Sequence, residues 1–100
     1  MSDSVERGFR LDTGTPGTLG VHGVLDFGTA AAALLAIRSA SHGMDRLDLS
    51  GVTRSDSAGL ACVLAVMAEA GRNRAAVQVT GMPEGMQALA RVCEVDQLIS

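Results

Sequence analysis

The sequence predicts an α/β fold, in which a mixed four-stranded β-sheet carries about three α-helices within a single domain. Turn-forming residues gather at 12–17, between two short segments that are compatible with strands, and this is the pattern of an N-terminal hairpin. Ala- and Leu-rich stretches with helical spacing then alternate with short Val- and Leu-rich segments, which predicts βα units. We expect the helices to pack on one face of this sheet.

The hairpin strands follow from their local patterns. Residues 9–11 predict a short strand at the start of the hairpin. Residues 18–24 alternate between apolar and polar or small side chains, with Leu19 and Val21 on one face and His22 on the other. This period of two predicts a half-buried second strand.

The stretch 28–41 predicts the first helix, which Gly43 is placed to stop. The apolar residues that recur there at helical spacing are Ala30, Ala33, Leu34 and Ile37. A short strand is expected at 47–49, where two leucines are flanked by aspartates. Residues 50–55 are polar and contain glycine, and we expect them to form a loop.

The second half repeats the alternation of helix and strand. A second helix is predicted from 57 to 70 and is closed by Gly71. A strand is expected at 75–80. A third helix covers 83–93, with Pro83 as a favourable first helical residue.

The helix predicted at 57–70 is apolar on nearly every side, because Glu69 is its only charged residue. One stripe at helical spacing should face the sheet, and it consists of Leu60, Val63, Leu64 and Met67. Two interpretations of the opposite side remain open. It is an Ala-rich surface that stays in contact with water, or it is a surface on which a partner docks.

Composition and charge exclude several classes of function. Hydrophobic residues make up 47% of the 100 residues, so disorder of the whole chain is not expected. Aromatic residues make up 2% and the net charge is −3, so neither base-stacking platforms nor a basic field for nucleic acid is expected. The first seven residues lack the apolar core of a signal peptide, and the longest apolar run, 60–68, is too short to span a bilayer. We therefore expect a cytoplasmic protein without direct membrane insertion.

Metal, cofactor and catalytic motifs find no support in the residues. Cys62 and Cys93 match no Cys-x-x-Cys or zinc spacing and are read as small buried thiols. His22 and His42 are scattered, and neither has a recognisable partner for general base catalysis. We expect no metal, no cofactor and no enzymatic activity.

The segment 55–60 is the most informative part of the chain. Either Ser55 or Asp56 can cap the helix that follows by accepting hydrogen bonds from its free N–H groups. If Asp56 is the cap, the hydroxyl of Ser57 is free in the first turn, where the helix dipole favours negative charge. Gly59 has a low helix propensity, so we expect something to approach the helix start closely. A serine hydrolase that uses Ser57 is disfavoured, because no Gly-x-Ser-x-Gly elbow surrounds this serine.

Two motifs in this order of elements resemble the STAS domain, the fold of bacterial anti-sigma factor antagonists. The first runs from Asp56 to Leu60 after a short strand, and the second is Gly23-Val24-Leu25-Asp26 before the first helix. The sequence from Gly81 to Pro83 before the last helix also fits the family pattern. The resemblance covers residues 9–97, and we expect a STAS domain at 9–100 after a flexible N-terminus at 1–8.

The resemblance implies a binding module and leaves two branches open. The first is MlaB, the small STAS subunit of the Mla phospholipid-transport ABC complex, which binds the ATPase subunit MlaF at the cytoplasmic face of the inner membrane and supports assembly and ATPase activity. The chain is most similar to this branch. The alternative is an antagonist that an anti-sigma factor kinase switches by phosphorylation. The resemblance makes Ser57 the phosphoacceptor-equivalent position, with the motif loop of Gly23, Leu25 and Asp26 beside it.

We expect the partner to dock on the start and the outward face of the second helix. Arg54 is suited to a bidentate contact with a carboxylate at the rim of this surface. The expected partner-binding residues are Thr53, Arg54, Ser55, Asp56, Ser57, Ala58, Cys62 and Val66.

Overall fold

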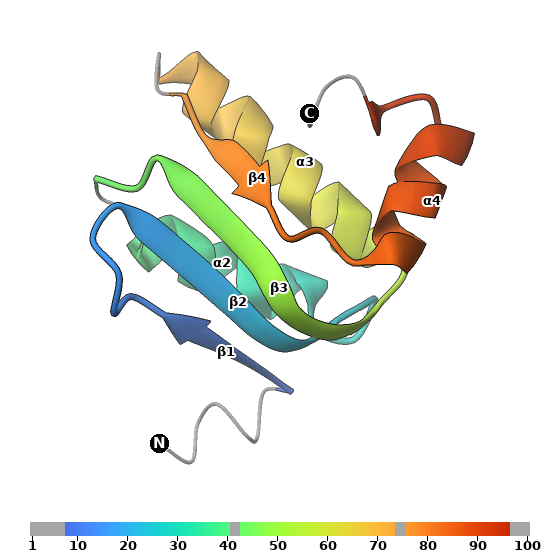
Figure 1. Cartoon of the computed structure of the whole chain (residues 1–100), viewed down its shortest axis with the longest axis horizontal. Helices are drawn as coiled ribbons and strands as arrows, with labels where there is room; N and C mark the ends of the chain where they lie inside the picture. Colours follow the sequence, from blue (N-terminus) through green and yellow to red (C-terminus); the bar gives the residue numbers. More distant parts are fainter. Residues whose placement is uncertain (1–7, 41–42, 74–75, 97–100) are drawn as a thin grey trace.

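The computed structural model describes residues 8–40, 43–73 and 76–96, which form four strands and three helices (Figure 1). The strands are β1 (Phe9–Asp12), β2 (Thr18–Leu25), β3 (Arg46–Ser55) and β4 (Gln78–Thr80), and the helices are α2 (Ala30–Ala40), α3 (Ser57–Arg72) and α4 (Glu84–Val92). All four strands belong to one sheet in the order β1-β2-β3-β4. The predicted mixed four-stranded sheet with three helices is confirmed.

The hairpin and the βα units give the sheet its mixed pairing. β1 and β2 are antiparallel, whereas β3 is parallel to β2 and to β4. The backbone N–H of Thr18 donates to the carbonyl of Thr15 over 3.0 Å and closes the hairpin turn. The turn predicted at 12–17 is therefore present, and the parallel strands that follow are joined through helices, as parallel strands require.

The third strand is longer than its sequence pattern indicates. The expected loop at 50–55 is wrong, because β3 continues to Ser55 and pairs with β2 up to the register Leu25↔Ser55. The pairing shifts register at two places, between Gly20 and His22 and between Gly23 and Val24 of β2. These irregularities interrupt the period of two, and β3 keeps its strand conformation because β2 supplies hydrogen-bond partners along its length.

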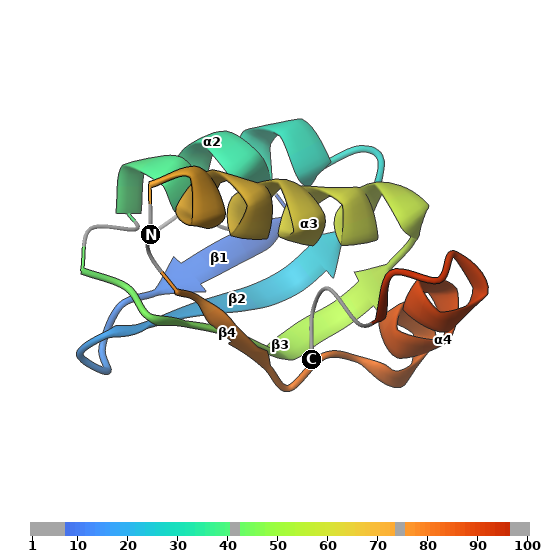
Figure 2. The same cartoon turned by 90° about the horizontal axis from the view of Figure 1, so that it is seen from above.

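Helices α2 and α3 cover one face of the sheet, while α4 lies beyond the end of the sheet beside α3 (Figure 2). The expectation that the helices share one face therefore holds for two of the three. The other face of the sheet is not covered by a helix in Figure 1. There the imidazole of His22 lies against Gly51, with its Nε2 atom 3.8 Å from Oδ2 of Asp12.

The hydrophobic core lies between the sheet and the helices α2 and α3. Both leucines of the predicted third strand are fully buried, as are Leu19 and Val21 of β2. From α2, Ala33 and Ile37 enter this layer, in agreement with the predicted apolar stripe. The remaining buried apolar residues are Phe9, Leu25, Val52, Leu60, Cys62, Val63, Val66, Met86 and Ala90.

Helix α3 is rotated relative to the orientation that its apolar stripe predicts. Cys62 and Val66 are 4% and 6% exposed, so their expected place on the outward, partner-binding face is wrong. Of the stripe expected to face the sheet, Leu60 and Val63 are buried as predicted, whereas Leu64 and Met67 are only half-buried. The helix runs two residues past the predicted end, to Arg72, and is capped by the backbone N–H of Asn73.

Gly59 explains the rotation. A Cβ atom on this residue would overlap the carbonyl oxygen of Leu25 at the end of β2. The close approach expected at Gly59 is thus made by the chain itself, and it turns the Gly59 side of the helix toward the sheet. Cys62 and Val66 follow Gly59 at helical spacing and are carried into the core with it.

Some predictions concern residues outside the described ranges. The flexible N-terminus expected at 1–8 is one of them, except for Gly8, and so are His42 and the expected strand start at Ala75. In the described part of the chain, no helix combines the length and the apolar character needed to cross a membrane.

Candidate functional site

Two loops meet where the parallel strands β2 and β3 end. The strands run in the same direction, so their carboxyl ends lie at the same edge of the sheet. The loop 26–29 leads from β2 into α2, and Asp56 leads from β3 into α3. Both helices therefore begin at one end of the molecule, near α4 (Figure 2).

Asp56 joins these two loops through its carboxylate. Its Oδ1 atom accepts hydrogen bonds from the backbone N–H groups of Ala58 (2.9 Å) and Gly59 (3.2 Å), which caps α3. Its Oδ2 atom accepts from the backbone N–H of Phe27 over 3.1 Å, across 29 positions of sequence. One side chain therefore fixes the start of α3 and its position relative to the loop before α2.

The surroundings of Asp56 stabilise its charged form. Desolvation by itself raises the pKa of this carboxyl. The three backbone N–H groups of Phe27, Gly59 and Ala58, together with the nearby charge of Arg54, outweigh desolvation and hold the pKa of Asp56 below its ordinary value of 3.8. Asp56 is thus a carboxylate at neutral pH, and it acts as a structural acceptor.

The loop before α2 is held by its own polar side chains. The Thr29 hydroxyl donates to the carbonyl of Val24 (2.9 Å) and accepts from the backbone N–H of Asp26 (2.9 Å). The Asp26 Oδ1 atom accepts from the N–H of Gly28 over 2.9 Å. These bonds, with the one from Phe27 to Asp56, fix most of the backbone of residues 26–29 in a single conformation.

Ser57 is the first residue of α3, and its side chain is exposed. Within the described residues its hydroxyl makes no hydrogen bond, because Asp56 has taken the capping role. The next residues on this outer side, Ala58 and Ala61, carry only methyl groups. The arrangement therefore offers a free hydroxyl on a surface that another molecule can approach closely.

The chemical options at Ser57 are narrow. The only histidine described, His22, lies on the open face of the sheet against Asp12 and Gly51. Burial raises the pKa of the Cys62 thiol to about 11, so this sulfur stays protonated at neutral pH and is a poor nucleophile. The described residues contain no cluster that could hold a metal ion.

The end of β3 forms the rim of this surface. The Thr53 hydroxyl donates to the carbonyl of Gly23 over 3.2 Å and so joins β3 to β2. Arg54 is exposed and has no ion pair among the described residues, whereas Ser55 is half-buried. Of the residues expected to bind a partner, Thr53, Arg54 and Ser57 are exposed.

The three motif residues beside the site, Gly23, Leu25 and Asp26, have different structural roles. Gly23 adopts φ +95°, a conformation that favours glycine, and a Cβ atom there would collide with the carbonyl of Gly8. Leu25 is completely buried, and its carbonyl faces Gly59. Gly23 and Leu25 therefore position the loop, and only Asp26 of the three expected motif residues reaches the loop itself.

Phe27 is a surface residue of this site that the sequence analysis did not single out. Its side chain is 85% exposed, although its backbone is bonded to Asp56. A signal was present in the sequence, since Phe27 is one of two phenylalanines in a chain without Trp or Tyr, and it stands between Asp26 and Gly28 in a turn-like segment.

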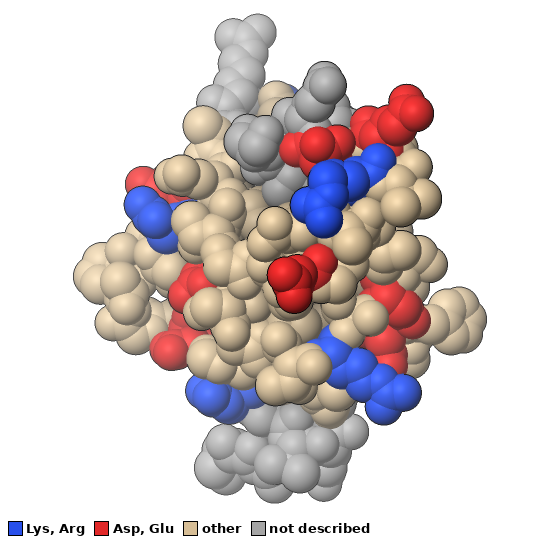
Figure 3. Space-filling view, turned by 45° about the vertical axis from the view of Figure 1, so that its right-hand side comes forward, with Lys and Arg blue, Asp and Glu red and all other residues tan. Residues whose placement is uncertain are grey.

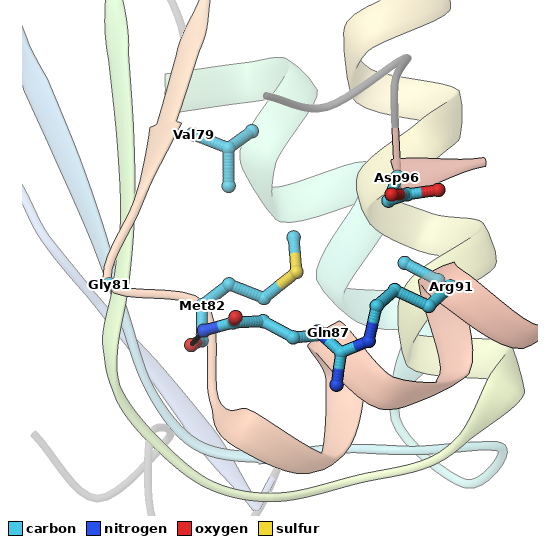
Figure 4. A pocket seen from close by; sticks show the side chains of 7 residues that line it. Val79, Gly81, Met82, Gln87, Arg91 and Asp96 are labelled. Carbon is cyan, nitrogen blue, oxygen red and sulfur yellow. Dashed lines mark hydrogen bonds between the residues drawn. The ribbon is translucent and has the colours of Figure 1, made fainter. Parts of the chain in front are cut away.

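A hollow of about 370 Å³ lies between β4 and α4 and contains none of the expected site residues (Figure 4). Val79 and Met82 give it an apolar floor, and Arg91 and Asp96 stand at its rim (Figure 4). The amide of Gln87 donates to the carbonyl of Met82 over 2.8 Å, which joins α4 to the segment after β4. Its described lining holds no histidine or hydroxyl that could act as base or nucleophile.

Figure 3 shows no large patch of one charge sign on the face that it presents. On the face in Figure 3, acidic and basic residues are scattered singly or in mixed groups across a surface that is otherwise uncharged. This distribution gives no electrostatic footprint for a phosphate backbone on that face.

Solved structures of other proteins share this fold. The structure of the anti-sigma factor antagonist SpoIIAA in its unphosphorylated form is similar with a TM-score of 0.69 and 16% identity, covering 92% of this chain and 85% of that one. The structure of the Bacillus cell fate determinant SpoIIAA in the phosphorylated form gives a TM-score of 0.65 and 17% identity, covering 92% and 88%. The fold is thus that of the anti-sigma factor antagonists, the STAS fold.

The model of one protein family, described as "Mlab, STAS domain", matches residues 11–100, and the chain belongs to this family. No curated protein sequence matches the chain.

Proposed function

We propose that this protein is a non-enzymatic STAS subunit that binds the MlaF-like ATPase of a phospholipid-transport ABC complex at the cytoplasmic face of the inner membrane. In this role it supports the assembly and the ATPase activity of the complex. Membership of the family described as "Mlab, STAS domain" supports the proposal. The docking surface consists of Ser57, Ala58 and Ala61 at the start of α3, with Thr53 and Arg54 at its rim.

The free hydroxyl of Ser57 is the observation that carries the proposal. Asp56 satisfies the N–H groups of Ala58 and Gly59, so Ser57 is not required to cap the helix. An exposed serine without a structural task, among alanines at a helix start, is available for contact with a partner. The small side chains around it let a helix or loop of the ATPase approach the backbone of α3.

Titration calorimetry with the purified ATPase subunit tests the proposal. Ser57→Glu is expected to weaken binding at least tenfold, because the added charge must be desolvated against a surface of methyl groups. Ser57→Thr keeps the hydroxyl and should bind like the wild-type chain. Thr15→Glu, which adds the same charge in the exposed turn at the opposite end of β2, serves as the control.

Two outcomes would contradict the proposal. A wild-type chain that does not bind the ATPase subunit removes the proposed partner. Equal affinity of Ser57→Glu and Thr15→Glu removes the start of α3 from the interface. Purification of the tagged chain from its native cells in mild detergent, followed by mass spectrometry, identifies the partner independently.

The alternative function is that of an anti-sigma factor antagonist switched at Ser57. The similarity to SpoIIAA in unphosphorylated and phosphorylated forms favours this candidate. A phosphoryl group on Ser57 would add a charge of about −1.5 to −2 at a helix N-terminus, where the dipole tolerates it. This function predicts that a kinase-like anti-sigma factor co-purifies with the chain and transfers phosphate from ATP to Ser57, and that Ser57→Ala abolishes the transfer.

A further inference from the structure

We propose that Phe27 is the anchor residue of the docking surface, and that it inserts into an apolar pocket of the ATPase subunit whose rim carries a carboxylate opposite Arg54. The inference rests on the proposed function and names the contact that dominates binding to the ATPase subunit. Phe27 is not part of either family motif, and its exposure is seen only in the structure.

The two phenylalanines of the chain have contrasting environments. Phe9 is 3% exposed and belongs to the core, whereas Phe27 is 85% exposed. Large exposed side chains are found singly on many proteins and carry no argument by themselves. Phe27 differs from such cases because its backbone is fixed and because its N–H is bonded to Asp56, the residue that precedes Ser57.

Rigidity of the backbone makes Phe27 suitable as an anchor. Its N–H is bonded to Asp56, and the residues on both sides of it, Asp26 and Gly28, are joined by the 2.9 Å bond between the Gly28 N–H and Asp26 Oδ1. Thr29 closes the loop on the carbonyl of Val24. An anchor whose backbone is already ordered loses little conformational entropy on binding, which is the advantage of preorganisation.

The position of Phe27 joins it to the proposed interface. Asp56 Oδ2 accepts from Phe27, while Asp56 Oδ1 caps the turn that begins with Ser57. Phe27 and Ser57 are therefore neighbours of the same carboxylate. Gly28 and Ala58 beside them have no side chain beyond a methyl group, so nothing large covers the ring on the protein itself.

Arg54 defines the polar part of the partner surface. Its charge lies close enough to Asp56 to act on that carboxylate, and it has no ion pair among the described residues. Asp56 already accepts three backbone hydrogen bonds and has little capacity for a guanidinium. A carboxylate of the partner would therefore form an ion pair with the Arg54 guanidinium, next to the pocket that receives Phe27.

A single tryptophan provides the test, because the chain has no Trp or Tyr. Phe27→Trp introduces the only tryptophan, at an exposed position that should leave the fold unchanged. Addition of the purified ATPase subunit, itself free of tryptophan by substitution, should shift the emission of this residue to shorter wavelength as its indole becomes buried. Val92→Trp, at an equally exposed position of α4 (80% exposed), is the matched control and should show no shift.

Affinity measurements complete the test. Phe27→Ala should weaken binding by about 30-fold or more, as expected for a central aromatic anchor, while Val92→Ala should not change it. Arg54→Gln should slow association and reduce its dependence on salt. Urea midpoints equal to that of the wild-type chain exclude a folding effect, because the Phe27 side chain packs against little of the protein.

The outcomes separate this inference from the proposed function. A wild-type chain without affinity for the ATPase contradicts both. A wild-type chain that binds and is weakened by Ser57→Glu, together with an unshifted emission at position 27 and normal affinity of Phe27→Ala, overturns the anchor alone. A concentration-dependent shift without the ATPase would reveal association of two copies of this chain, and it would also overturn the anchor as proposed.

Discussion

The two sides of α3 are built from similar small residues and lie in opposite environments. The inward side presents Gly59, Cys62 and Val66, which are buried, and the outward side presents Ser57 and Ala61, which are exposed. Hydrophobicity alone does not separate them, because alanine, valine and cysteine are all compatible with either environment. The contact between Gly59 and the Leu25 carbonyl decides which side faces the sheet.

This difference teaches how a helix that is apolar on nearly every side obtains a unique orientation. A stripe of large side chains normally sets the orientation, but here Leu64 and Met67 remain half-buried. The backbone of α3 approaches β2 at Gly59, because this residue has no Cβ atom. At the start of α3 the outward side is then left with the methyl groups of Ala58 and Ala61 and the hydroxyl of Ser57.

The largest expected effect on stability comes from a charge on the buried side of α3, compared with the same charge on the exposed side. Val66→Asp buries a carboxylate without a partner and should lower the free energy of unfolding by about 4 kcal/mol or more. Ala68→Asp, on the exposed side, should lower it by only about 0.5–1 kcal/mol. Urea unfolding followed by far-ultraviolet circular dichroism measures both, and equal effects would contradict the orientation of α3.

A methyl group at Gly59 tests the contact that orients the helix. Gly59→Ala should lower the free energy of unfolding by about 3 kcal/mol, because the added Cβ atom overlaps the Leu25 carbonyl and both elements must shift. Gly85→Ala in α4, where nothing lies within 4 Å of the added atom, should instead raise it by up to about 1 kcal/mol. A stabilising Gly59→Ala would show that α3 does not approach β2 in this way.

Removal of the Asp56 side chain, which caps the start of α3, has the smallest expected effect on stability. Asp56→Ala should lower the urea midpoint at pH 7 by less than Gly59→Ala does, since it removes hydrogen bonds but creates no overlap. The pKa of Asp56 is lowered in the folded state, so its contribution is fully present above the ordinary value of 3.8 and is lost as the pH falls below it. The difference between Asp56→Ala and the wild-type chain should therefore shrink between pH 7 and pH 3.

A difference that stays constant over this pH range would contradict the role of Asp56 as a charged acceptor. Asp45→Ala is a suitable control, because Asp45 is exposed and lies outside the site.

Much of the fold could be predicted because its elements have strong local patterns. The hairpin turn at 12–17 and the stripe of Ala33 and Ile37 in α2 depend on nearby residues alone. The extension of β3 through 50–55 could not be predicted in the same way. Polar residues such as Ser50 and Thr53 are tolerated there because β2 lies alongside and their side chains reach solvent.

The candidate site was predictable in its chemistry and less so in its membership. Asp56 and Ser57 were found because a capping residue and a first-turn residue are recognisable along the chain. Cys62 and Val66 were misplaced because the orientation of α3 depends on Leu25, far away in sequence. Phe27 was missed because exposure of an aromatic ring is a property of the assembled structure.

The sequence by itself determined the order of the elements, the hairpin, the position of the helix cap and the family to which the chain belongs. These properties arise from interactions between residues that are close along the chain, or from motifs that can be read directly. Tertiary structure alone decided which side of α3 is buried, how far β3 extends and that Phe27 stands exposed on a backbone bonded to Asp56. Each of these depends on a backbone contact between distant segments, above all the approach of Gly59 to Leu25 and the bond between Phe27 and Asp56.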